Sequence, residues 1–93
     1  MALERRRVHY EGRVQGVGFR YTAARLAPGF GVSGSVRNLH DGRVELEAQA
    51  EPDKLREFLG AIRGELGSKI HRETEEGMPD DPGESPGDFR IRF

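Results

Sequence analysis

The sequence predicts an α+β fold in which two helices cover one face of an antiparallel-rich sheet. Two segments repeat apolar residues at helical spacing, several others alternate apolar and polar residues, and turns with glycine or proline separate them. The chain has 93 residues, of which 34% are hydrophobic and 33% are charged. This composition suffices for one small core with a polar surface, so we expect a single soluble domain over residues 1–93.

The first elements in the chain are a strand and a helix. Val8 and Tyr10 alternate with charged residues, which predicts a half-buried strand. From Phe19 onward the apolar spacing becomes helical, and Pro28-Gly29 is expected to end this helix after about two to three turns.

Residues 32–39 and 44–50 predict the second and third strands. Asp41-Gly42 lies between them, and this dipeptide between two strand-like segments is a strong hairpin signal. The face of the sheet away from the helices would carry polar residues whose opposite charges could pair across strands, namely Arg7, His9, Glu11, Arg13, Glu45, Glu47 and Gln49.

The second half of the chain predicts a helix followed by two short strands. The helix begins near Pro52 and has an amphipathic stripe made of Leu55, Phe58, Leu59, Ile62 and Leu66. Residues 70–75 form a weakly patterned strand, residues 77–87 a surface loop, and residues 89–93 a short last strand. The order βαββαβ, with a small extra C-terminal strand, is the ferredoxin-like split βαβ arrangement.

A glycine-rich stretch, Gly12-Arg13-Val14-Gln15-Gly16-Val17-Gly18-Phe19-Arg20, joins the first strand to the first helix. Its glycines permit a tight turn, and the unpaired N–H groups that begin a helix attract anions, phosphate in particular. Arg20 adds a permanently charged donor beside this cradle. Tyr21 replaces the third glycine of a dinucleotide fingerprint, and the Lys-Ser or Lys-Thr of a nucleotide-triphosphate loop is missing. From the residues alone, an ordinary strand-to-helix turn is an equally good interpretation.

Asn38 is a second candidate for the same site. It shares strand parity with Val36, so its side chain is expected on the helix side of the sheet, near the end of the strand. The loop after the first strand lies over such strand ends, and an amide there could hold and orient a water molecule. The alternative is that Asn38 caps the hairpin, which is the commoner role of an asparagine at this position.

The segments GRVQGVGFR and GSVRNLHDGRVE together resemble the acylphosphatase family, and the closing DFRIRF resembles its last strand. The resemblance implies a core strand order of 4-1-3-2 and hydrolysis of the carboxyl–phosphate bond without a metal or a cofactor. It implies that the loop backbone holds the phosphoryl oxygens, through Gln15, Gly16, Val17, Gly18, Phe19 and Arg20. It also implies two catalytic residues, the essential Arg20 and Asn38, which would position the attacking water.

The chain departs from the family pattern at three places. Ser35 replaces a usual aromatic residue and should face away from the helices, which would affect stability rather than chemistry. Pro28-Gly29 interrupts a position where the first helix usually continues, and residues 77–87 are unusually rich in proline, glycine and acidic residues.

Composition limits the partners of this protein. A net charge of −1 gives no long-range attraction to nucleic acid or to an anionic membrane, and no segment is long enough to span a bilayer. The absence of cysteine suits the cytoplasm. His9, His40 and His71 lie too far apart in sequence to suggest a metal site. We therefore expect a cytoplasmic monomer acting on a small acyl phosphate. The alternative is a non-catalytic module of the same fold that binds phosphate, carbamoyl phosphate or a protein.

Overall fold

The structure is a computed structural model and describes residues 2–93. Its elements in chain order are β1 (Glu4–Gly12), α1 (Phe19–Leu26), the 3₁₀ turn η1 (Ala27–Phe30), β2 (Ser33–Asn38), β3 (Val44–Ala50), α2 (Pro52–Leu66), the 3₁₀ turn η2 (Gly67–Lys69), β4 (Ile70–Met78) and β5 (Phe89–Arg92). The strands form one sheet in the order β4-β1-β3-β2-β5. Only β2 and β5 are parallel among the paired strands of the described residues. The ferredoxin-like α+β fold is confirmed, as is the order 4-1-3-2, with β5 added beside β2.

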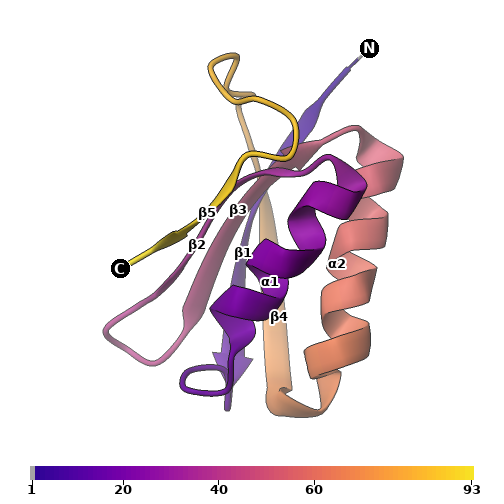
Figure 1. Ribbon diagram of the computed structural model, residues 1–93. Helices are drawn as coiled ribbons and strands as arrows, with labels where there is room; N and C mark the ends of the chain where they lie inside the picture. Colours follow the sequence, from indigo (N-terminus) through magenta and orange to yellow (C-terminus); the bar gives the residue numbers. More distant parts are fainter. Residues whose placement is uncertain (1) are drawn as a thin grey trace.

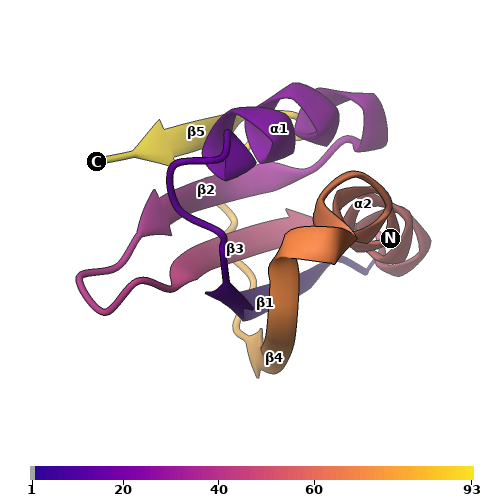
Figure 2. The same ribbon diagram turned by 90° about the horizontal axis from the view of Figure 1, so that it is seen from below.

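Both helices lie on the same face of the sheet, with α1 over the β2 side and α2 over the β1 side (Figures 1 and 2). The alternation in β1 sends Val8 and Tyr10 into the core beneath them. In α2, all five residues of the predicted stripe are buried. Phe58 packs between Phe30 and Phe89, so the middle of α2 holds both η1 and β5 against the core. No helix within residues 2–93 combines the length and the apolar character that crossing a membrane requires.

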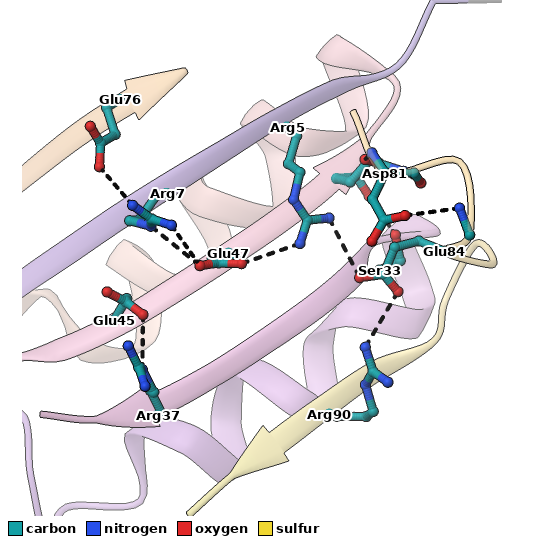
Figure 3. Close-up of polar contacts among 12 residues, drawn as sticks. Arg5, Arg7, Ser33, Arg37, Glu45, Glu47, Glu76, Asp81, Glu84 and Arg90 are labelled. Carbon is teal, nitrogen blue, oxygen red and sulfur yellow. Dashed lines mark hydrogen bonds and ion pairs between the residues drawn. The ribbon is translucent and has the colours of Figure 1, made fainter. Parts of the chain in front are cut away.

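The opposite face of the sheet carries a network of ion pairs that crosses several strands (Figure 3). Glu47 of β3 accepts hydrogen bonds from Arg5 and Arg7 of β1. Its neighbour Glu45 pairs with Arg37 of β2, at 2.9 Å, and with His9 of β1, also at 2.9 Å. The predicted pairing of opposite charges across strands is therefore confirmed.

The loop that follows β4 folds back onto this charged face. Gln49 of β3 exchanges two hydrogen bonds with the backbone of Asp81, at 3.0 and 2.7 Å. Glu84, whose side chain is only 7% exposed, lies 3.5 Å from Arg5 and 3.5 Å from Arg90 (Figure 3). The loop thereby connects β1 to β5 across the two strands that separate them.

Two elements differ from the sequence-based expectation or refine it, and one residue lies as expected. β4 runs to Met78 rather than ending at Glu75, because β1 offers pairing partners along its whole length and Met78 pairs with Arg5. The predicted loop therefore loses its first two residues. The first helix ends at Leu26 and then tightens into η1, which contains Pro28-Gly29. Ser35 faces the charged side of the sheet opposite Glu47, as expected.

Candidate active site

The glycine-rich stretch forms the loop between β1 and α1, at the same end of the sheet as the β2–β3 hairpin (Figure 1). β1 stops at Gly12, where its pairing with β4 shifts register. An added Cβ at Gly12 would lie 2.4 Å from the Lys69 carbonyl oxygen, so only glycine fits there. Gly18, with φ of 82°, then turns the chain into α1 in a left-handed conformation that suits glycine.

The first turn of α1 leaves its backbone donors free of helical partners. The first bond of the helix runs from the Thr22 N–H to the Gly18 carbonyl, at 2.9 Å. The N–H groups of residues 18–21 therefore have no carbonyl within the helix. No side chain caps this end, and the first turn holds no acidic residue. Free backbone donors at the positive end of a helix dipole are groups that can bind an anion.

Arg20 lies in this first turn, and its contacts leave its charge uncompensated within the described residues. Its Nη1 donates to the Arg92 carbonyl at 3.4 Å, and its Cζ lies 4.8 Å from the centre of the Phe93 ring. Neither a carbonyl nor an aromatic ring neutralises a guanidinium, so Arg20 can still bind an anion bidentately.

Asn38 lies at the end of β2, paired with Val44. It shares its face with the fully buried Val36, which places it on the helix side, as predicted. The side chain that caps the hairpin turn is that of Asp41, which accepts a hydrogen bond from the Arg43 N–H at 3.1 Å. The parallel pairing of Arg37 with Arg92 also brings the end of β5 alongside Asn38.

These residues surround one small pocket. Its volume is about 130 Å³, and its lining consists of Val14, Gly16, Gly18, Phe19, Arg20, Tyr21 and Asn38. Five of the seven predicted site residues thus line the same cavity. Of the two others, Val17 packs against the hydrophobic core, and Gln15 turns its side chain toward the hairpin.

The role of the Gln15 side chain was missed by the sequence reasoning, which assigned only its backbone to the site. Its Nε2 donates to the Leu39 carbonyl at 2.7 Å and to the Arg43 carbonyl at 2.9 Å. Both acceptors belong to the hairpin that follows Asn38. The loop is therefore fastened to the strand end that carries Asn38. A glutamine placed between apolar and glycine residues was the available signal.

Tyr10 and Phe19 form the floor under the start of α1. Their ring centres lie 4.7 Å apart, and both side chains are buried. Burial, with a smaller contribution from Glu73, raises the pKa of Tyr10 far above its usual range, so the phenol stays neutral. Its hydroxyl has no hydrogen-bond partner in the described part of the chain.

The three histidines do not meet in the fold. His9 pairs with Glu45 on the charged face of the sheet, and His40 lies in the hairpin turn. Across residues 2–93, no three or more His, Cys, Asp or Glu side chains gather closely enough to hold a metal ion.

Comparison with known proteins finds one family along nearly the whole chain. The sequence model described as Acylphosphatase matches residues 6–91. A protein of Clostridium acetobutylicum named Acylphosphatase is 48% identical over 61 residues, which cover 66% of this chain and 67% of that protein. Another, from Synechococcus sp., is 44% identical over 80 residues, covering 85% and 80%. The crystal structure of acylphosphatase from Bacillus subtilis superposes with a TM-score of 0.83 at 30% identity, covering 99% and 100% of the two chains.

Proposed function

Since this chain belongs to the acylphosphatase family and is an acyl phosphate hydrolase, we propose that the hydrolysis takes place in the pocket between α1 and the end of β2. One observation supports this assignment: Asn38, Arg20 and the residues at the start of α1 all line one cavity of about 130 Å³. That volume equals about four water molecules at about 30 Å³ each, which is room for a phosphoryl group and one water.

The phosphoryl group binds in the cradle. Backbone N–H groups of the loop from Gln15 to Arg20 donate to its oxygens, and the Arg20 guanidinium adds two charged donors. In phosphoryl transfer the negative charge is spread over the equatorial oxygens in the transition state, so donors fixed around them stabilise it. The loop is fastened at two points, because the Arg13 N–H donates to the Lys69 carbonyl and the Gln15 side chain donates to the hairpin.

Asn38 positions the nucleophile. Its side-chain amide holds a water molecule so that the water oxygen attacks phosphorus in line with the acyl oxygen. A bond forms between the water oxygen and phosphorus, and the bond between phosphorus and the acyl oxygen breaks. The acyl oxygen keeps the electron pair of that bond, and the acyl group leaves as a carboxylate. Asparagine is too weak a base to take the proton, which moves to a phosphoryl oxygen of the substrate. The contribution of Asn38 is therefore orientation rather than proton transfer. No step of this mechanism uses a metal ion.

The test compares Arg20→Gln with Arg25→Gln on the same helix. Arg25 is exposed and pairs with Glu65 at 2.6 Å, so it controls for the loss of one positive charge from α1. We expect the first variant to lose about 10³- to 10⁵-fold in kcat/KM for benzoyl phosphate, the range of an arginine that stabilises phosphoryl transfer. The second should stay within about twofold, and circular dichroism should show that both fold. Equal rates for the two variants would defeat the assignment of Arg20.

Asn38→Ala tests the positioning of water. We expect kcat to fall by about 10²-fold while inorganic phosphate still inhibits, because the cradle is intact. Unchanged turnover would remove Asn38 from the mechanism. If wild-type protein bound phosphate but released none from acyl phosphates, a binding module would be the better interpretation of the pocket.

The proposal also describes a monomer located in the cytoplasm. Among the described residues, the large hydrophobic side chains that are exposed are Leu3, Tyr21 and Phe93, which do not supply the apolar patch of a stable dimer. A chain without cysteine needs no oxidising compartment. Light scattering after gel filtration and cell fractionation test the two statements.

A further inference from the structure

The pocket is small for a whole acyl phosphate that carries a bulky acyl group. Its volume is about 130 Å³, the space of about four water molecules, and a phosphoryl group with one water takes up a large part of it. Such an acyl group must therefore leave the pocket through its mouth and lie against the residues around it.

Two of those residues are exposed aromatics. Tyr21, which lines the pocket, is 64% exposed, and Phe93 is 92% exposed. Phe93 does not line the pocket itself, but its ring packs over the guanidinium of Arg20, a residue that lines the pocket, at 4.8 Å. A single exposed apolar side chain is ordinary. Among residues 2–93, however, two of the three large hydrophobic side chains that are exposed are Tyr21 and Phe93, and the third, Leu3, borders a different hollow together with Phe30. Exposed aromatic surface is thus concentrated at the one cavity that would bind phosphate.

We propose that Tyr21 and Phe93 form an acyl subsite, which makes this enzyme favour acyl phosphates whose acyl group is aromatic or bulky and apolar. The proposal rests on the proposed function of the pocket. The acyl group covers exposed surface of Tyr21 and of the Phe93 ring, beside the part that already contacts Arg20. Burial of aromatic surface on both partners strengthens binding of benzoyl phosphate, whereas the methyl group of acetyl phosphate reaches too little of it.

The experiment measures kcat/KM for benzoyl phosphate and for acetyl phosphate in four proteins: wild type, Tyr21→Ala, Phe93→Ala and the control Leu3→Ala. The quantity compared is the ratio of kcat/KM for benzoyl phosphate to kcat/KM for acetyl phosphate. The intrinsic reactivities of the two substrates are the same in every protein, so they cancel when this ratio is compared between variants. We expect this ratio to fall by about threefold to tenfold in each aromatic variant, the range of one aromatic pair. Leu3→Ala should keep the wild-type ratio.

The inhibition constant of inorganic phosphate separates a subsite from a supporting role, because phosphate has no acyl group. If Phe93 only holds Arg20 in place, its removal will weaken both substrates equally and raise the inhibition constant of phosphate by the same factor. That result, or an unchanged ratio in both aromatic variants, would overturn the subsite while leaving the proposed function intact. A wild-type protein inactive on both substrates would instead overturn the proposed function, and the subsite with it.

Discussion

Replacing Gln15 with methionine should reduce activity by more than the accompanying loss of folding stability would explain. Methionine is also unbranched and of similar length, but it cannot donate hydrogen bonds. The change removes the bonds to the Leu39 and Arg43 carbonyls, at 2.7 and 2.9 Å. Each bond contributes about 0.5–1.5 kcal/mol, so the loop would lose about 1–3 kcal/mol of its attachment to the hairpin. If that energy orders the cradle in the transition state, kcat/KM falls by about 5- to 160-fold.

The assay is phosphate release from benzoyl phosphate, with urea unfolding measured on the same preparations. Gln49→Met is the matched control. Gln49 also makes two bonds to backbone groups, those of Asp81 on the other face of the sheet, although it is buried whereas Gln15 is half-buried. Both variants should lose a similar free energy of unfolding, but only Gln15→Met should lose activity beyond about twofold. If the two variants keep the same kcat/KM, the glutamine side chain does not position the loop.

Three further predictions concern stability. Tyr10→Phe removes a buried hydroxyl without a partner and should raise the free energy of unfolding by about 1 kcal/mol, measured in urea. Burial opposes ionisation of Glu45, but hydrogen bonds from its histidine and arginine partners outweigh it and hold the pKa of this carboxyl below its usual range. The ionised Glu45 carboxylate therefore stabilises the fold above its unfolded pKa, and this stabilisation is lost as the pH falls through its folded pKa. Between about pH 6 and about pH 3, the Tm of Glu45→Gln should thus drop less than the Tm of the wild type. Gly34→Ala should cost more than about 2 kcal/mol, because φ is 135° and its Cβ would lie 1.9 Å from a carbonyl oxygen of β3; Gly64→Ala, in open space on α2, should not destabilise.

Local patterns were sufficient to predict most of the fold. Alternation in β1 and β3 and the stripe of α2 show which side chains face the helices and the core, and the sequence displays this directly. In β3 the polar side chains of the other face are largely covered as well, which the alternation does not show. β4 was harder, because an edge strand with most of its side chains in solvent has little apolar pattern, and its length is set by pairing with β1. The position of the 79–88 loop could not be predicted at all. It depends on contacts such as Arg5 with Glu84, which lie 79 residues apart in the chain.

For the candidate site too, local patterns predicted the place of single residues but not the contacts between distant segments. Strand parity was enough to place Asn38 on the helix side, and glycine spacing was enough to place Arg20 at the start of a helix. That the two line one pocket depends on how the loop crosses the strand ends, which the sequence pattern allowed and the family resemblance implied. The bonds of Gln15 and the contact of Arg20 with Phe93 join segments that no local pattern relates.

The attachment of the phosphate loop to the hairpin has a consequence for motion in the working enzyme. Asn38 and the two carbonyls that hold Gln15 belong to the same turn of chain. When that turn tilts or shifts by thermal fluctuation, the loop and the amide travel together. In the proposed mechanism, the distance from the attacking water oxygen to phosphorus would then vary less than the position of the loop or of Asn38 alone.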